Sequence, residues 1–426
     1  MNRNLILAGI VLVLLGCVEN LSSGDPDPTV TMQTNNPYPT TYKVGWNVYD
    51  PDPEHLWNRV FRQFYRRVSQ DGSEYGADEL DPLLWFDTTH LLQGSSHQAA
   101  IQVLDEFLRT NAETLVRDPL KRAIFQRDLW AVFDWLVFQT EPYPAQREAL
   151  EMRLAKIIKR VALTEAEILS LPDNYILAVE SKIFPADFQA DQPQKAFLPF
   201  DLFHPESAWI PVGREGGPVA MSHTEGFPFF GRSVFLVFVR SPDGRNATLD
   251  FIKSLNTDPQ TVLTTGSDVA LVRRMILIDD QGDLVLSPLI ETIQIRHFNP
   301  EQIFHEFELS RMLLFEGSSG GLDLNQDLFL LFFSHGDVFE FNSPPDLQAT
   351  IPEICKACHF AYPHVPNSGN TQSIISYSRA NFSLPNNERP ILMPTSWNNE
   401  AQVVIGWKHN HNTWRNLEDL WKRENP

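Results

Sequence analysis

Residues 273–286 have the sequence RRMILIDDQGDLVL, which decides the fold of the middle of the chain. Two apolar runs, Arg273–Ile278 and Leu284–Leu286, flank the polar stretch Asp279–Asp283. Apolar runs separated by a short turn rich in Asp and Gly are typical of a β-hairpin. The pattern therefore predicts two antiparallel strands joined by residues 279–283.

Segments on both sides of this stretch also favour extended structure. The continuously apolar run Val234–Val239 is followed by Pro242-Asp243-Gly244, which is a turn signal. We therefore predict that residues 181–344 form a β-rich domain, either a sandwich or an irregular sheet. Further strand candidates are Thr292–His297, Phe307–Phe315 and Leu328–Phe333.

The residues before this domain favour helices instead. Residues 123–138 are apolar around most of a helical circumference, which indicates a central, buried helix. Thr164 and Glu167 have the spacing of a capping box, which marks the start of a helix. Residues 42–180 are therefore predicted to be all-α, with helices at 55–67, 99–115, 123–138, 148–161 and 164–170.

The C-terminal part has little regular periodicity. From Pro344 onward it is rich in Asn, Ser and Pro turns, and a last helix is predicted only at about residues 414–423. We predict a small irregular or α-helical segment over residues 345–426. Together the three regions predict an α+β chain.

Length and charge limit the classes of function. The chain has 426 residues, enough for two or three domains, and a formal net charge of −20. Such an acidic chain repels nucleic acid and anionic lipid, so we expect neither as a functional partner. A basic protein partner is compatible with this charge.

The N-terminus has the pattern of an export signal. Residues 1–16 place one arginine before an apolar run that is too short to span a bilayer, and Cys17 follows. Leu14-Leu15-Gly16-Cys17 resembles the lipobox of bacterial lipoproteins, a family in which the cysteine is acylated and becomes the first mature residue. The alternatives are a secretory signal with an incidental cysteine and an uncleaved anchor, and both also export the chain. The polar residues 17–41 are expected to be a flexible tether.

Cys355-Lys356-Ala357-Cys358-His359 is the motif with the clearest chemistry. Two thiols at this spacing can each bond to a haem vinyl group, and the following histidine is then placed to bind the iron. C-x-x-C-H therefore predicts a covalently attached haem c, with Cys355 and Cys358 as attachment residues and His359 as an iron ligand. Covalent haem attachment outside the bacterial cytoplasm agrees with the export signal.

Three other interpretations of these cysteines remain open. A local disulfide between Cys355 and Cys358 would leave His359 without a role. A zinc site could add His364, His409 or His411, although His409 and His411 do not have the usual H-x₃₋₅-H spacing. A thioredoxin-type redox pair would need a β-α-β context, and the sequence does not show one.

The sixth iron ligand has one methionine candidate. Met393-Pro394 resembles the Met-Pro that supplies this ligand in many class I cytochromes c, and Met393 is the single methionine after the motif. His364, His409 and His411 are the rivals. The chain departs from class I cytochromes c because the motif lies near the end of the chain and Phe360 follows it. That departure puts the class I fold in doubt more than it does haem attachment.

Two weaker motifs are also present. Gly317-Ser318-Ser319-Gly320-Gly321 matches G-x-S-x-G, but a strand rather than a helix is predicted after it, so a Gly/Ser hairpin loop is favoured over a hydrolase. Asp323–Asp327 begins like a calcium-binding loop and lacks the glycine and glutamate that such a loop needs.

These observations predict an exported, lipid-anchored haem protein of the bacterial cell envelope, with the periplasmic side of the outer membrane favoured. The expected activity is one-electron transfer to or from an envelope redox or docking protein, rather than enzymatic catalysis. Contact with the membrane is expected through the lipid anchor alone. The alternative is a cofactor-free envelope lipoprotein with a structural or binding role, in which Cys355 and Cys358 form a disulfide.

Overall fold

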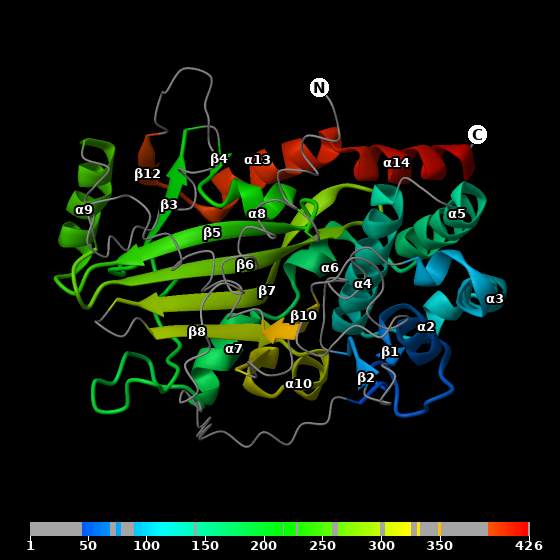
Figure 1. Ribbon diagram of the computed structural model, residues 1–426, viewed down its shortest axis with the longest axis horizontal. Coiled ribbons are helices and arrows are strands. Elements are labelled where there is room, and N and C mark those ends of the chain that lie inside the picture. Colours follow the sequence, from blue (N-terminus) through cyan, green and yellow to red (C-terminus); the bar gives the residue numbers. More distant parts are fainter. Residues whose placement is uncertain are drawn as a thin grey trace, which may run out of the picture.

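The centre of the fold is an antiparallel sheet with the strand order β12-β3-β5-β6-β7-β8-β9, and β4 pairs with β3 at one side (Figure 1). The structure is a computed structural model that describes residues 45–68, 74–77, 89–139, 143–215, 217–226, 229–257, 263–298, 303–324, 330–332, 348–350 and 391–424. The strands of this sheet are β3 (Ile210–Arg214), β4 (Gly217–Pro218), β5 (Ser233–Arg240), β6 (Asp268–Ile278), β7 (Leu284–His297), β8 (Ile303–Leu309), β9 (Leu322–Asp323) and β12 (Leu392–Pro394).

The predicted hairpin is confirmed as β6 and β7, which pair from Ile278 and Leu284 at the turn back to Asp268 and His297. The Asp279 carboxylate closes the turn by accepting hydrogen bonds from the backbone N–H groups of Gln281 (3.0 Å) and Asp283 (2.8 Å). Gly282 has φ = +93°, a backbone conformation that glycine adopts without a steric cost. The predicted strand at Thr292–His297 is the second half of β7.

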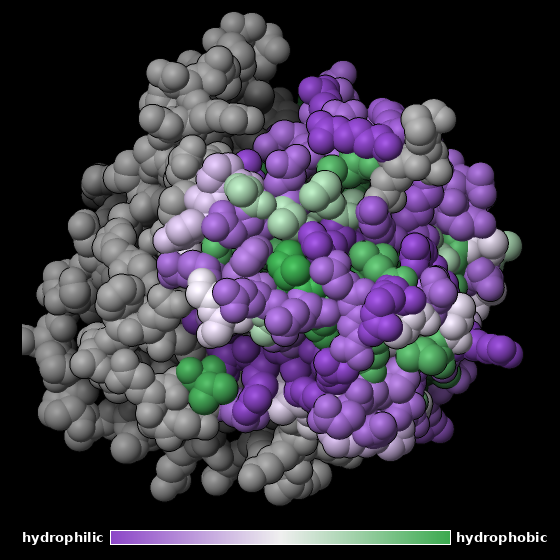
Figure 2. Space-filling view, turned by 90° about the vertical axis from the view of Figure 1, so that its right-hand side faces the viewer, coloured by the Kyte–Doolittle hydropathy of each residue, from purple (hydrophilic) through white to green (hydrophobic). Residues whose placement is uncertain are grey.

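Most of the helices before the sheet gather at one end of it (Figure 1). This end is largely hydrophilic at its surface, with apolar residues scattered singly (Figure 2). The helices are α2 (Leu56–Tyr65), α3 (Gly94–Thr110), α4 (Pro119–Phe138), α5 (Pro144–Arg160), α6 (Glu165–Leu169) and α7 (Asn174–Ser181), with 3₁₀ turns η2 (His90–Leu92) and η3 (Ala112–Thr114) and a short strand pair, β1 (Arg67–Val68) and β2 (Glu74–Tyr75).

The central helix predicted at residues 123–138 is confirmed as α4. Asp118 caps it by accepting hydrogen bonds from the N–H groups of Leu120 and Lys121, and Pro119 occupies its first turn, where no N–H donor is needed. Every residue from Ala123 to Leu136 is buried. The predicted capping box of Thr164 and Glu167 also forms, at the start of α6.

The two faces of the sheet pack against different elements. Leu236 and Phe238 of β5 contact the apolar cluster that contains α7, whereas Phe235 and Val237 contact the cluster under α9 (Arg245–Thr257). This division follows from the alternation of side chains along a strand. Both faces of β5 are therefore buried, which explains why its sequence is continuously apolar.

Two C-terminal helices, α13 (Trp397–Asn410) and α14 (Asn412–Glu424), return to the helical end of the molecule (Figure 1). Trp421 donates a 2.8 Å hydrogen bond from its indole N–H to the carbonyl of Ala155 in α5. The remaining elements are α8 (Met221–Glu225), α10 (Arg311–Glu316), η4 (Ser319–Gly321) and a separate strand pair, β10 (Leu330–Phe332) and β11 (Gln348–Thr350).

The fold class α+β is confirmed by these elements, but parts of the predicted secondary structure are wrong. The strand predicted at Phe307–Phe315 ends at Leu309, because Ser310 caps α10 by accepting a hydrogen bond from Leu313 N–H. The turn signal Pro242-Asp243-Gly244 is followed by α9, a helix for which no prediction was made. The helices α7, α9 and α13 were not predicted.

Candidate functional site

Most of the predicted site residues lie outside the described residues. These are the acylation candidate Cys17, the attachment residues Cys355 and Cys358, the ligand His359 and its rival His364. Met393, His409 and His411 are described, and so is Ser319. The surroundings of these four residues can therefore be described.

Met393 lies on the edge strand β12, opposite Gly213 of β3. The strand is fixed by Asn256 of α9, whose side chain donates to the Leu392 carbonyl and accepts from the Leu392 N–H, both at 2.8 Å. Leu392 is buried in the cluster under α9. Because side chains alternate along a strand, Met393 points to the other face of the sheet, and 41% of it is exposed. Met393 is therefore partly exposed on a strand that is bonded to β3 and α9.

The two histidines near the C-terminus have different surroundings. His409 is exposed, and its ring lies 5.5 Å from that of Trp414. His411 stacks on Trp407 and Phe230, with ring centroids 4.6 and 5.8 Å away. Burial, with a smaller contribution from the nearby Lys408 cation, lowers the pKa of His411 to about 4, so its ring is neutral at pH 7.

The G-x-S-x-G motif does not form a nucleophile elbow. Ser319 lies on η4, between α10 and β9, and its hydroxyl donates a 3.2 Å hydrogen bond to the carbonyl of Leu322. A nucleophile elbow needs a strand before the serine and a helix after it, which is the reverse of this order. The predicted hairpin loop is also wrong in detail: β8 and β9 do pair antiparallel, but a helix and a 3₁₀ turn connect them.

A network of buried charges, which sequence reasoning missed, ties α13 to the rest of the body. The carboxylate of Asp134 in α4 accepts hydrogen bonds from Lys408 Nζ (2.5 Å) and Arg232 Nη1 (2.6 Å). Lys408 also donates to the Thr413 hydroxyl at 2.8 Å and lies over the Trp130 ring. Burial lowers the pKa of Lys408 to about 8.

Two further ion-pair groups join α4 to neighbouring elements. Glu291 of β7 contacts Arg127 at 3.0 Å and Arg273 of β6 at 3.1 Å. Asp128 holds Arg311 of α10 through two hydrogen bonds, of 2.5 and 3.1 Å. The three carboxylates Asp128, Asp134 and Glu291 thus each have cationic partners in the core, and the spacing of these residues in the chain gives no signal of the pairing.

The last residue of β7, His297, is buried beside Asp268 of β6. Its Nδ1 lies 2.8 Å from the Asp268 carboxylate, which also accepts from Arg240 Nε at 2.8 Å. The ring of Phe188 stacks on the imidazole at 3.8 Å. This pair resembles the base and orienting carboxylate of a hydrolase, but the described contacts of His297 are with Asp268, Phe188 and Phe197, none of which is a nucleophile. We assign it a structural role.

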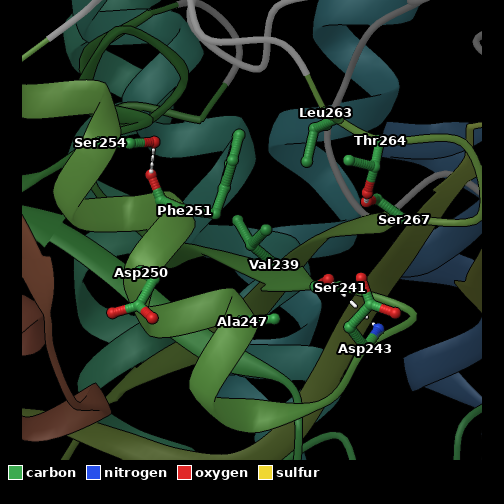
Figure 3. A pocket seen from close by; sticks show the side chains of 10 residues that line it. All are labelled: Val239, Ser241, Asp243, Ala247, Asp250, Phe251, Ser254, Leu263, Thr264 and Ser267. Atoms are coloured by element: carbon green, nitrogen blue, oxygen red, sulfur yellow. Dashed lines mark hydrogen bonds between the residues drawn. The ribbon is translucent and has the colours of Figure 1, made fainter.

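A pocket of about 370 Å³ lies between α9 and the ends of β5 and β6 (Figure 3). Three of its hydroxyls are hydrogen-bonded to neighbouring protein groups: Ser254 donates to the Phe251 carbonyl at 2.7 Å, and the hydroxyls of Thr264 and Ser267 are 3.0 Å apart. The described lining contains no histidine, lysine or cysteine. The lining residues are Val239, Ser241, Asp243, Ala247, Asp250, Phe251, Ser254, Leu263, Thr264 and Ser267.

Comparison with known proteins and a survey of the described residues give no further assignment. The chain matches no protein-family model, no curated protein and no solved structure. The described ranges contain no group of three or more His, Cys, Asp or Glu side chains placed to hold a metal ion. None of the helices in those ranges has the length and apolar character needed to cross a membrane.

Proposed function

We propose that the chain is an exported, lipid-anchored c-type haem protein that transfers single electrons in the bacterial cell envelope. The observation that carries the proposal is the sequence Cys355-Lys356-Ala357-Cys358-His359. Each thiol would add across one haem vinyl group, so that sulfur bonds to one vinyl carbon and hydrogen to the other, without a change in electron count. His359 would then bind the iron.

The position of Met393 supports the proposal. A sixth ligand must reach the iron from a fixed support, and Met393 lies half-exposed on a strand that is bonded to both β3 and α9. A thioether ligand raises the reduction potential of the haem, whereas an imidazole ligand lowers it. His411 is the weaker rival, because its ring is stacked between two aromatic side chains.

The charge of the chain suggests the kind of redox partner. With a formal net charge of −20, the protein attracts a basic partner over long range and speeds their encounter at low ionic strength. The partner we propose is therefore a basic envelope redox protein.

The test of haem attachment is a visible spectrum and an intact mass of the full chain, made in a host that matures c-type haem. We expect a Soret band and an added mass of roughly 616 Da. The double variant Cys355→Ser/Cys358→Ser should lose both, whereas Cys17→Ser should keep them. The opposite result is a wild-type chain that has no Soret band and whose mass is two hydrogens below that of the reduced, haem-free chain. That result would show a disulfide and establish the cofactor-free lipoprotein.

The test of the sixth ligand uses two methionines of equal exposure. Met393→Ala should abolish the near-infrared sulfur-to-iron charge-transfer band, because the thioether is lost. Met152→Ala is the matched control, since Met152 in α5 is also 41% exposed and should leave the band unchanged. Persistence of the band in Met393→Ala would show that another thioether is the ligand, whereas a wild-type protein without the band would make His409 and His411 the next residues to replace.

A further inference from the structure

The outer face of α7 exposes apolar side chains. Tyr175 and Ala178 are buried against the sheet, whereas Ile176 and Leu177 on the solvent side are 49% and 40% exposed. Ile183, just beyond the end of the helix, is 46% exposed. The helix thus has apolar residues on both sides, although only one side packs on the described core.

Phe200, which is 63% exposed, belongs to a segment that is also bonded to α7. The Tyr175 hydroxyl donates to the carbonyl of Pro199 and accepts a 3.1 Å hydrogen bond from Leu202 N–H, so the segment that carries Phe200 is held against α7. We call Ile176, Leu177, Ile183 and Phe200 the α7 surface. A group of exposed large apolar residues on one side of a molecule often marks a contact surface.

The chain that leads from Cys17 enters the body on the same side. Gly45, the first described residue, donates its N–H to the sulfur of Met312 in α10 at 3.0 Å. η4 packs between α10 and α7: a Cβ on Gly321 would meet Leu314 of α10, and one on Gly320 would meet the backbone of α7. Figure 1 shows α7 and α10 near each other on one side of the sheet.

The proposed lipid anchor would keep the body, and the α7 surface with it, within reach of a bilayer. The chain between Cys17 and Gly45 can span no more than about 100 Å. Tethering raises the effective concentration of a weakly binding surface near its target, so a few apolar side chains are enough to fix an orientation.

We propose that the α7 surface lies against the membrane that holds the acyl chains of Cys17. This inference rests on the proposed lipid anchor, and it departs from the sequence-based expectation that the anchor is the only membrane contact. Glu180 and Lys182 are exposed beside the apolar residues, so the contact is at the level of the headgroups, where charges stay hydrated. The acidic chain favours zwitterionic over anionic lipid.

The experiment places an environment-sensitive fluorophore at residue 177 through Leu177→Cys and at residue 152 through Met152→Cys. Residue 152 in α5 has nearly the same exposure and lies outside the α7 surface. The acylated full chain is reconstituted in phosphatidylcholine vesicles that contain spin-labelled lipid. We expect at least threefold quenching at residue 177 and none at residue 152. Equal quenching at the two sites would overturn the proposal.

A second arm separates the contact from the anchor. Intact mass reports whether Cys17 is acylated. In parallel, a chain that carries a histidine tag in place of Cys17 is bound to vesicles with nickel-chelating lipid, which keeps the same tether without acylation. Quenching at residue 177 in this chain supports the membrane contact even if acylation of Cys17 fails.

Loss of quenching at residue 177 in the tagged chain would overturn the contact even if Cys17 is acylated. A control without vesicles tests whether a second copy of the chain covers the surface. If the fluorophore at residue 177 becomes shielded from water as the protein concentration rises, the α7 surface is a contact between copies and the membrane proposal is overturned. The variant Ile176→Ser/Ile183→Ser should reduce the quenching at residue 177 severalfold, and Met152→Ser should not change it.

Discussion

Asp134 shows how single residues determine the position of the C-terminal helices. Its carboxylate is fully buried and bonds to Arg232, which immediately precedes β5, and to Lys408 of α13. A buried charge is tolerated only when partners replace its hydration. Because the partners are 98 and 274 residues away in the chain, this pairing depends on the completed fold.

The two sides of this ion pair should respond unequally to substitution. Asp134→Asn leaves Lys408 and Arg232 buried without their shared carboxylate, so we expect a loss of about 3–5 kcal/mol in the free energy of unfolding. Lys408→Met leaves Asp134 bonded to Arg232 and replaces the lysine stem with an apolar chain, so we expect a loss of about 1–2 kcal/mol. Urea unfolding of the two variants measures the difference. A larger loss in Lys408→Met would show that the lysine, rather than the arginine, is the essential partner.

His411 should make the protein less stable in mild acid. Its folded pKa is about 4, below the unfolded value of about 6.5. Between these values the unfolded chain binds a proton that the folded chain does not, so stability falls as the pH decreases from about 6.5 to about 4. Because the ring is only partly buried, we expect a contribution of about 1–2 kcal/mol.

Urea unfolding at several pH values, in the wild type and His411→Gln, isolates this contribution. The difference in stability between the two proteins should shrink as the pH falls through this window. His223 is buried and also has a pKa of about 4, but it is present in both proteins and its effect cancels. Parallel stability curves for the two proteins would contradict the assignment.

At the scale of elements, local sequence signals predicted helices and turns better than they predicted tertiary contacts. The all-round apolar pattern of α4, the capping box of α6 and the turn between β6 and β7 were all visible in the sequence. The strand prediction at residues 307–315 failed because the apolar run continues into α10, and the Ser310 cap that separates the two elements was overlooked. The apolar pattern of α13 is weak because its buried face includes Glu400 and Lys408.

The packing of η4 against α7 gives a prediction about one glycine. Gly320 has φ = +59°, and a Cβ there would lie 2.7 Å from the Ala178 nitrogen and closer still to the Asn174 carbonyl oxygen, both backbone atoms of α7. Backbone cannot move aside as a flexible side chain can, so Gly320→Ala should cost about 3 kcal/mol or more.

Gly317 is the matched control because it has φ = +69° and nothing within 4 Å of its would-be Cβ. Gly317→Ala meets only the conformational cost, which is about 1 kcal/mol. Thermal unfolding of both variants gives the comparison. Equal losses would show that backbone conformation, rather than contact with α7, is what requires glycine at residue 320.

At the scale of the whole molecule, the sequence predicted the fold class, a mixture of helices and strands, but not how the helical and β-rich regions pack together. The mixture of helices and an antiparallel sheet followed from periodicity, because each period depends on neighbouring residues. The placement of Met393 beside β3 and α9 depends on contacts with residues more than 130 positions away, which no local pattern contains. The predicted boundaries at residues 180 and 344 are local inferences of the same kind, and they stay predictions.

The largest apolar cluster joins residues from all three predicted regions. It includes Trp57 and Phe125 of the helical region, Ile276 of the sheet, and Trp414 and Trp421 of α14. Because one core is shared, we expect the described body to unfold in a single cooperative transition. Loss of helix, sheet and tryptophan fluorescence should then have the same urea midpoint.

Trp421→Ala tests this expectation most directly, because Trp421 bonds to Ala155 of α5 and lies beside Gly282 in the turn at one end of the β6–β7 hairpin. Truncating a buried tryptophan costs about 3–5 kcal/mol. In a cooperative molecule that loss lowers the midpoint of every signal, including the infrared amide band of the sheet. If the helical signal shifted while the sheet signal stayed at the wild-type midpoint, the helical and β-rich regions would be separate folding units, and the shared apolar cluster would be an interface between domains rather than one core.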